Sequence, residues 1–295
     1  MNPRVSVLIP VYNAESHLDE ALDSIRGQSL ADFECITVND GSTDGSLHKL
    51  QETAAHDPRF RVIDQPNGGI VAALNAGLEQ CSAAYVARMD ADDIALPERL
   101  AAQHHFLEAS PQIVAVGGTA RRIDSANHRL DAIQNPTDPQ RASAMALAGG
   151  YALLHPTMMI RRAALKQIGG YDPAYQNSED LDLILRLLQV GGLANLAEEV
   201  LLYRQANGTM SGRYHKTYPL YDFKALLAAR RRGQPVHRRD LARMADRVSW
   251  SALQTGPLRL SLGYALRAAT LCPWSTVGPR ALMRLVSHVL RPAKP

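Results

Sequence analysis

Apolar residues come in short runs along the first third of the chain, and a segment with helical spacing follows most of them. Residues 5–11 form one continuous apolar run, and Leu18, Leu22 and Ile25 then recur every three or four positions. This pattern predicts a buried strand followed by an amphipathic helix. Further strands are predicted at 33–38, 60–63 and 83–89, and a further helix at 70–80. Such alternation is typical of an α/β fold with a mostly parallel sheet covered by helices on both faces.

The pattern is less regular after residue 96, and the chain shows no internal repeat. It predicts a helix at 97–109, a strand at 113–117, a polar hairpin at 121–133, a strand at 155–160 and a helix at 178–190. Asn177 or Ser178 is expected to cap the last helix, with Glu179 and Asp180 in its first turn.

Three acidic residues follow the predicted strand at 83–89 within four positions: Asp90, Asp92 and Asp93. In an open α/β sheet, ligands bind beyond the carboxyl ends of the strands, so these side chains are well placed to meet one. Because carboxylates alone would repel a phosphorylated ligand, we expect Mg²⁺ or Mn²⁺ between the acids and diphosphate oxygens. The alternative is a solvated acidic turn in which Asp93 caps the helix that begins near Pro97.

A second polar segment, residues 39–46, follows the predicted strand at 33–38. It is rich in turn-forming residues, and its Asp44 is placed to cap the next helix. By contrast His155, which stands beside Pro156 at a predicted strand start, is expected to be packed or hydrogen-bonded rather than catalytic.

The composition is that of a globular chain, because 46% of its 295 residues are apolar. The first apolar run is too short for a signal peptide, so we expect no secretion and a cytoplasmic protein. The best candidate for a membrane span is interrupted by Arg259 and Arg267, so no span is expected. Three widely separated cysteines, Cys35, Cys81 and Cys272, favour reduced core thiols over a disulfide or a zinc site.

Charge divides the chain into two parts. Residues 1–212 contain 16 basic and 26 acidic residues, whereas residues 213–295 contain 16 basic and 3 acidic ones. This asymmetry predicts an acidic catalytic body and a basic region directed to an anionic surface.

Within the basic region, segments 258–271 and 281–290 mix apolar residues with spaced arginines. Helices of this kind lie in membrane interfaces, which predicts peripheral attachment to the cytoplasmic face of a membrane. The alternative is a helical subdomain packed on the catalytic body. We expect no nucleic-acid partner, because Trp250, Tyr264 and Trp274 are too dispersed to form a stacking platform.

Five motifs in order make the chain resemble the inverting nucleotide-sugar glycosyltransferases of family 2. The motifs read SVLIPVYNAESHL, VNDGSTDGS, QPNGGIVAALNAGL, YVARMDADD and GGYDPAYQNSEDLDLILRL. The resemblance covers roughly residues 4–212 and implies a GT-A fold, with a Rossmann-like nucleotide-sugar part at about 1–118 and an acceptor part at about 119–212. Residues 213–295 would then form a basic helical C-terminal region.

The resemblance also implies where the nucleotide binds. Pro10, Tyr12, Glu15 and Asp40 match residues that surround the base and ribose. Asp40 would accept a hydrogen bond from the imide N–H of a pyrimidine, which favours UDP or dTDP over a purine donor. Asn39 stands where relatives often have another Asp, and a neutral amide there is expected to cost little.

Two further acids would carry the chemistry. By the same resemblance, Asp92 would bind the metal directly, and Asp90 would approach the ribose or reach the metal through water. Asp180 matches the base that removes the acceptor proton, with its charge favoured at a helix start. Glu179 would orient the acceptor or nearby backbone.

The remaining expected contacts are cationic. Relatives often carry Arg where this chain has Leu74, so Arg88 or later basic residues are expected to compensate at the phosphates. Arg204 and His215 flank a glycine-containing segment, 207–213, that resembles a loop able to close over a diphosphate.

Together these features predict a metal-dependent inverting transferase that moves a sugar from a nucleotide diphosphate, favoured as UDP, to a hydroxyl of a sugar, glycolipid or lipid-linked saccharide of the cell envelope. One alternative is a catalytically silent sugar-nucleotide-binding protein. A Rossmann oxidoreductase is disfavoured because no Gly-x-Gly-x-x-Gly follows the first strand. A sugar-1-phosphate nucleotidyltransferase would need a glycine-rich, basic first loop, which this chain lacks.

Overall fold

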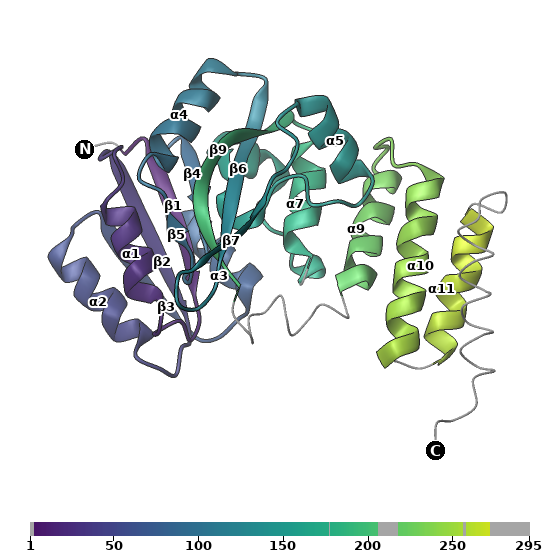
Figure 1. Ribbon diagram of the computed structural model, residues 1–295, viewed down its shortest axis with the longest axis horizontal. Coiled ribbons are helices and arrows are strands. Elements are labelled where there is room, and N and C mark those ends of the chain that lie inside the picture. Colours follow the sequence, from purple (N-terminus) through teal and green to yellow (C-terminus); the bar gives the residue numbers. More distant parts are fainter. Residues whose placement is uncertain (1–2, 177, 206–217, 256–257, 272–295) are drawn as a thin grey trace. The chain divides into compact units, whose positions relative to one another are not determined.

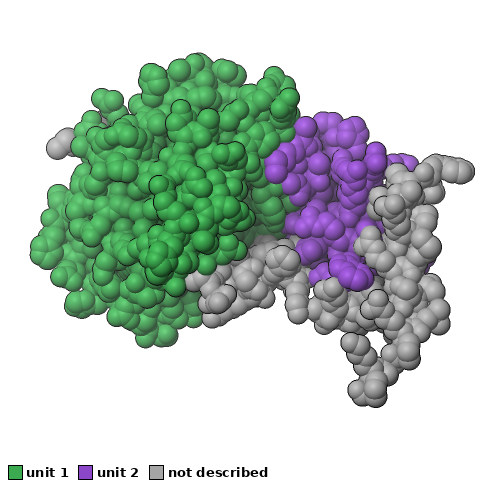
Figure 2. All heavy atoms as spheres, in the orientation of Figure 1, with its two compact units in different colours: residues 1–143, 151–206 green, residues 144–150, 207–295 purple. Residues whose placement is uncertain are grey.

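The computed structural model describes residues 3–176, 178–205, 218–255 and 258–271. The chain divides into two compact units (Figure 2). Unit 1 contains residues 1–143 and 151–206, and unit 2 contains residues 144–150 and 207–295. The limits expected from the sequence, near 118 and 212, stay predictions.

Within the described residues, the strands of unit 1 form one sheet in the order β3-β2-β1-β4-β8-β6-β9-β5, with β7 beside β6 (Figure 1). The strands are β1 (Val5–Val11), β2 (Phe33–Asp40), β3 (Phe60–Gln65), β4 (Tyr85–Arg88), β5 (Ile94–Ala95), β6 (Ile113–Ile123), β7 (Arg129–Ile133), β8 (Met159–Arg161) and β9 (Gly192–Arg204).

The first half of the sheet, β3-β2-β1-β4, is parallel throughout, as predicted. Every residue of β1 is buried, which agrees with its continuous apolar run. Helix α1 (Leu18–Arg26) packs its buried stripe with the Val7 face of β1. Helix α3 (Ile70–Gln80) covers the other face, where Gly77 closely approaches Leu8.

The second half of the sheet is mixed, which differs from the mostly parallel sheet expected. Strand β8 is antiparallel to both β4 and β6, and β5 is antiparallel to β9, whereas β6 and β9 are parallel. Parallel neighbours need long crossovers, whereas β6 and β7 are joined by a short hairpin. The hairpin predicted at 121–133 is thereby confirmed.

Among the helices of the described residues, α1, α3, α4, α7 and α11 lie where the sequence predicts helices, and the others, including two single turns of 3₁₀-helix, had no predicted bounds. They are α1 and α3, α2 (Ser46–His56), α4 (Arg99–Ala109), α5 (Pro139–Leu147), η1 (His155–Thr157), α6 (Arg162–Ile168), η2 (Pro173–Tyr175), α7 (Glu179–Leu187), α9 (Tyr218–Arg231), α10 (Arg238–Thr255) and α11 (Leu258–Leu271).

One predicted element is only half correct. The strand expected at 155–160 begins at Met159, because His155–Thr157 forms a turn of 3₁₀-helix instead. Pro156 has a fixed φ and no N–H, which suits the first turn of a helix better than a sheet ladder.

Unit 2 consists of helices packed through small and apolar side chains. Helix α10 packs against both α9 and α11 (Figure 1). Phe223 meets Tyr264 edge to face with ring centroids 5.5 Å apart, and the side chains of Leu226 and Met244 pack where Gly149 leaves space. The predicted helix at 258–271 is confirmed, and the one at 281–290 lies outside the described residues.

Candidate active site

The carboxyl ends of β1 and β2 bring the first two predicted loops together. Tyr12 is 55% exposed, so its ring remains accessible to a ligand. The Glu15 carboxylate accepts a hydrogen bond from the Gly45 amide at 2.9 Å, and Asp44 accepts from the Glu15 amide at 3.1 Å. Pro10 is buried in β1. The pairing of β1 with β4 ends at Leu8, so the missing N–H of Pro10 removes no hydrogen bond to β4.

Asp40 at the end of β2 is buried and holds the glycine-rich loop before α3. Its carboxylate accepts from the amides of Gly68 and Gly69, both at 2.9 Å, and from Gln65 Nε2 at 2.8 Å. Gly69 adopts a φ of +82°, a backbone conformation that is unfavourable for residues with a side chain. Since a carboxylate offers about four acceptor positions, one remains for a ligand such as a base N–H.

The neutral amide at position 39 has a structural reason. Asn39 donates from Nδ2 to Asp64 Oδ1 at 2.7 Å, and its Oδ1 accepts from the Ser42 amide at 3.3 Å. An Asp at this position would place two like charges side by side. The neighbour Asp64 lies on β3, 25 positions away, so spacing along the chain gave no signal for it.

The acidic turn after β4 contains three carboxyl groups in different environments. Asp90 Oδ1 lies 2.5 Å from Arg88 Nη2. Asp93 is buried and accepts from the Arg204 amide at 2.8 Å, so it serves the fold rather than a helix cap. Burial and the charge of Asp90 raise the pKa of Asp92 to about 6.

The environment of Asp92 fits a divalent cation. Its carboxylate is a hard oxygen ligand, and both burial and the neighbouring Asp90 charge disfavour its ionised form. A bound cation would offset both effects. No group of three or more His, Cys, Asp or Glu side chains suited to a metal occurs in the described part of the chain.

Arg88 is buried, with 4% of its surface exposed. Besides the ion pair with Asp90, its Nε and Nη1 atoms have no hydrogen-bond partner among the described residues. A buried guanidinium with two open donors is costly unless a ligand oxygen or water fills them. The predicted role at the phosphates remains a prediction.

The acids expected to act on the acceptor begin α7. Ser178 is its N-cap residue, and Asp180 Oδ1 accepts from the Leu181 amide at 2.8 Å. Burial raises the pKa of Tyr171, and the charges of Glu179, Asp180 and Asp90 raise it further. Charges at the start of α7 and in the acidic turn after β4 therefore both act on this tyrosine.

Arg204 does not fit the predicted contact with a diphosphate, because its side chain has no exposed surface. Its guanidinium donates to backbone oxygens of Asp92 at 2.7 Å and Asp124 at 3.2 Å, and to side-chain oxygens of Asn127 at 2.7 Å and Glu20 at 2.6 Å. Four acceptors from three separate segments thus fix it as a structural support of the acidic turn. His215 lies outside the described residues.

Sequence reasoning missed two residues that build the centre of this region, Asn75 and Tyr171. Asn75 binds the Tyr171 backbone, and the sequence contained one signal for the pair, because both lie inside the motifs quoted above. His155 is buried and its Nε2 lies 2.8 Å from the Tyr171 hydroxyl, so the packed, hydrogen-bonded histidine expected from the sequence is found.

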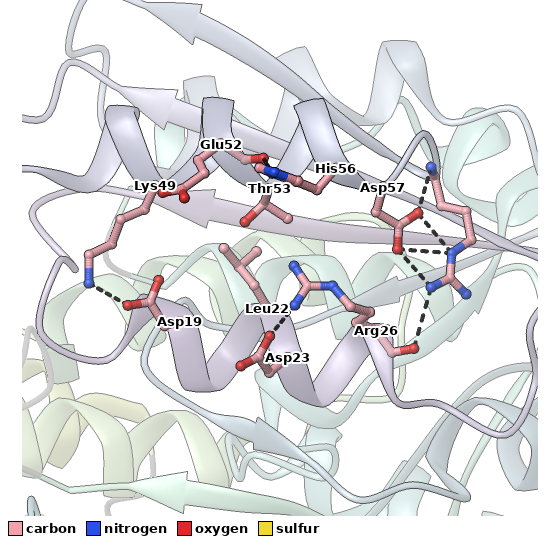
Figure 3. A pocket seen from close by; sticks show the side chains of 10 residues that line it. Asp19, Leu22, Asp23, Arg26, Lys49, Glu52, Thr53, His56 and Asp57 are labelled. Carbon is pink, nitrogen blue, oxygen red and sulfur yellow. Dashed lines mark hydrogen bonds and ion pairs between the residues drawn. The ribbon is translucent and has the colours of Figure 1, made fainter.

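A surface cavity of about 720 Å³ lies elsewhere, between α1 and α2 (Figure 3). Its charged side chains pair with one another, as in the ion pair of Lys49 with Asp19 at 2.6 Å. None of the predicted site residues lines it. The cavity is therefore not the site described here.

Comparison with known proteins identifies the chain at this point. The model of the family described as "Glycosyl transferase family 2" matches residues 6–169. EpsE of Bacillus subtilis (strain 168), which is named as a glycosyltransferase, is 33% identical over 216 residues, covering 72% of this chain and 76% of EpsE. The chain belongs to glycosyltransferase family 2. The resemblance seen in the motifs is confirmed, and this member of the family is an enzyme.

A second relative of this family-2 glycosyltransferase is WbnJ of Escherichia coli, named as an O-antigen biosynthesis glycosyltransferase. It is 30% identical over 207 residues, which cover 69% of this chain and 80% of WbnJ.

Solved structures share the fold of this family-2 glycosyltransferase. S. aureus TarS 1–349 in complex with UDP matches with a TM-score of 0.61 and 16% identity, over 95% of this chain and 92% of that chain. Mannosyltransferase PcManGT from Pyrobaculum calidifontis, in complex with GDP-Man and Mn²⁺, matches with a TM-score of 0.58 and 19% identity, over 98% and 88%. The GT-A fold is thereby confirmed.

Proposed function

We propose that this glycosyltransferase moves a sugar from a UDP-sugar to a hydroxyl acceptor with inversion at the anomeric carbon. The observation that carries the proposal is that carboxylates of two separate segments act on one buried side chain, that of Tyr171. Asp90 acts on its pKa from the turn after β4, and Glu179 and Asp180 act on it from the start of α7. Asp90 and Asp92 would face the diphosphate, and Glu179 and Asp180 would face the acceptor.

The reaction would be one displacement. Asp180 takes the proton of the acceptor hydroxyl, whose oxygen forms a bond to the anomeric carbon. The bond from that carbon to the diphosphate oxygen breaks at the same time, and UDP leaves with the electron pair. Attack from the side opposite the leaving group inverts the configuration. Glu179 would orient the acceptor beside Asp180.

The donor end of the site is supported by three side chains. The exposed Tyr12 offers a face to the base, and Asp40 retains one acceptor position for a pyrimidine N–H. Glu15 would act near the ribose through the loop that it holds by its bond to Gly45. TarS, which shares the fold, binds UDP in its solved complex, and this favours UDP for the present chain.

A divalent cation, Mn²⁺ or Mg²⁺, would be held by Asp92, with Asp90 reaching it through water. When bound, it would neutralise charge that develops on the departing diphosphate. Support comes from the partly buried Asp92 carboxylate, whose ionised form is disfavoured without a neighbouring cation. PcManGT, which shares the fold, contains Mn²⁺ in its solved complex. The open donors of Arg88 suit an oxygen of the bound donor.

The setting we propose is the synthesis of cell-envelope polysaccharide or glycolipid at the cytoplasmic face of a membrane. WbnJ is named for O-antigen biosynthesis, which supports a sugar or lipid-linked saccharide as acceptor. No helix within the described ranges combines the length and apolar character that crossing a bilayer requires. Contact with the membrane would therefore be peripheral, through the exposed arginines and the exposed Trp250 and Leu266 of unit 2.

Titration calorimetry with UDP tests the donor site. UDP should bind more tightly with Mn²⁺ or Mg²⁺ than with EDTA, and Asp92→Asn should abolish that difference. Asp23→Asn, which changes an exposed carboxylate of α1, is the matched control and should keep it. Equal affinity with and without metal in the parental protein would contradict a metal-bridged diphosphate. A parallel assay of UDP release in the presence of acceptor separates transfer from silent binding.

A further inference from the structure

Tyr171 is clamped through its backbone by a residue on a distant helix. Asn75 Nδ2 on α3 donates to the Tyr171 carbonyl oxygen at 2.8 Å, and the Tyr171 amide donates to Asn75 Oδ1 at 2.9 Å. The two residues are 96 positions apart, and Asn75 lies in the helix that begins directly after Gly69. Residues 66–69, the glycine-rich loop that Asp40 holds, are called the donor loop below. The clamp thus joins α3, the helix that follows the donor loop, to the segment that leads into α7.

The same segment also contacts the donor loop directly. A Cβ atom at Gly69 would lie 2.5 Å from Gln176 Nε2, and one at Gly170 would lie 2.9 Å from Asn75 Oδ1. Residues 170–176 therefore lie close to α3 at two places: at Gly69, directly before the helix, and at Asn75, in its middle. Two approaches at this distance leave the segment little freedom to slide along α3.

The side chain of Tyr171 is fixed independently of its backbone. It is 3% exposed, its hydroxyl lies 2.8 Å from His155 Nε2, and the two ring centroids are 5.6 Å apart. Burial, and secondarily the charge of Arg88, hold the pKa of His155 well below its usual value, so the imidazole is neutral. Burial raises the pKa of Tyr171, so the phenol stays protonated. The bond therefore joins two neutral groups and does not change near neutral pH.

The phenol lies among the charges of both acid groups. Asp90 and Arg88 act on it from the turn after β4, and Glu179 and Asp180 act on it from α7. The backbone before Tyr171 is also bonded to α7 itself, because Arg186 Nη1 donates to the carbonyl oxygens of Gly170 at 2.6 Å and Ile168 at 3.0 Å. The segment that contains Tyr171 is therefore linked to α7 by geometry as well as by charge.

We propose that Tyr171 is a positioning residue: fixed by Asn75 and His155, it holds the first turn of α7, and with it Asp180, at a set place relative to the donor loop. This inference rests on the proposed function, in which Asp180 takes the acceptor proton. Tyr171 itself does not touch the reacting atoms. It acts through the carboxylate that it positions.

The test is a double-mutant cycle on turnover. Tyr171→Phe removes only the hydroxyl and its bond to His155, and should lower kcat about ten-fold, which is about 1.4 kcal/mol in barrier. UDP affinity should stay within about two-fold, because the donor loop is untouched. In an Asp180→Asn background, Tyr171→Phe should cost nothing further, since the residue that it positions is already lost.

The matched control is Tyr85→Phe. Tyr85 is also buried, and its hydroxyl bonds Glu108 and Arg161 within the same unit. This variant loses two hydrogen bonds where Tyr171→Phe loses one, but it should keep the parental kcat. The inference is overturned if Tyr171→Phe keeps the parental kcat, or if it lowers kcat equally with and without Asp180.

A second measurement needs no turnover and keeps the two proposals distinguishable. In hydrogen exchange, amides of α7 should exchange faster in Tyr171→Phe and in Asn75→Ala than in Tyr85→Phe or the parental protein. Unchanged exchange in α7 would overturn the positioning role even if no donor is found. If exchange changes as expected but Asp180→Asn transfers sugar at the parental rate, the choice of base fails and the positioning of α7 stands.

Discussion

The two units place their arginines differently. In unit 1, the side chains of Arg88, Arg99 and Arg204 are buried. In unit 2, the arginines whose burial is described are all exposed: Arg230, Arg231, Arg232, Arg238, Arg239, Arg243, Arg247 and Arg267. The core of unit 2 contains apolar side chains such as Phe223 and Leu226, and its buried charged residue is an acid, Asp222.

The difference follows from the cost of burying a charge. An ionised group leaves water only if partners replace its hydration, so each buried arginine of unit 1 fixes several other residues in place. Such networks position a catalytic site. Exposed arginines retain much of their hydration, and they remain available to an external anionic surface even where they also bind a neighbour, as Arg243 binds Asp240. The buried arginines of unit 1 therefore serve its own structure, and we propose that the exposed ones of unit 2 also contact an anionic surface.

The largest expected effect concerns two aspartates that both stand in the first turn of a helix. Asp180→Asn in unit 1 removes the proposed base, and turnover should fall roughly 10² to 10⁴-fold with UDP affinity little changed. Asp240→Asn changes a first-turn aspartate of α10 in unit 2 and should leave turnover near the parental rate. Steady-state rates of sugar transfer by the two purified variants measure this difference. Equal losses of turnover in both variants would contradict the special role of Asp180.

The second prediction concerns stability. Arg204→Met leaves the carbonyl oxygens of Asp92 and Asp124 without this donor, whereas the half-exposed Glu20 carboxylate keeps its bond from Asn127. Because an unsatisfied buried acceptor costs about 1 to 3 kcal/mol, unit 1 should lose about 2 kcal/mol or more. Arg243→Met breaks an exposed pair with Asp240 at 3.4 Å in unit 2, and should change stability by less than about 1 kcal/mol.

Urea unfolding followed by circular dichroism, with the slope of the transition compared between variants, measures both changes. A loss from Arg204→Met as small as that from Arg243→Met would show that the buried network contributes little.

The smallest expected effect concerns surface binding. In a sedimentation assay, the full chain should pellet with anionic vesicles and should be released by high salt. It should not pellet with neutral vesicles. Arg231→Glu with Arg239→Glu in unit 2 should weaken the binding about ten-fold or more, since each basic residue near an anionic leaflet contributes on the order of 1 kcal/mol. Arg4→Glu with Arg61→Glu, which changes two exposed cations of unit 1, is the control and should bind like the parental chain. Indifference of the parental chain to vesicle charge would favour a basic unit that packs only within the protein.

The sequence by itself determined the parts that depend on local pattern. A short continuous apolar run is typical of a strand that is buried on both faces of a sheet. Strands β1 and β4 lie in such runs, and all of their residues are buried. The stripe of α1 and the alternation of strand and helix fixed the parallel half of the sheet in the same way. Since the carboxyl ends of parallel strands share one edge, the position of Asp40 and Asp90 at that edge also followed.

Only the tertiary structure decided which groups each polar side chain meets. Asn75 and Tyr171 are 96 positions apart, and Arg204 and Glu20 are 184 apart, so no periodicity links them. From the sequence, Arg204 looked like a cation free for a phosphate; in the fold its surroundings exclude water and occupy its donors. Burial sets the role of such a group, because it turns a solvated charge into one that must be paired, and burial is a property of the whole chain.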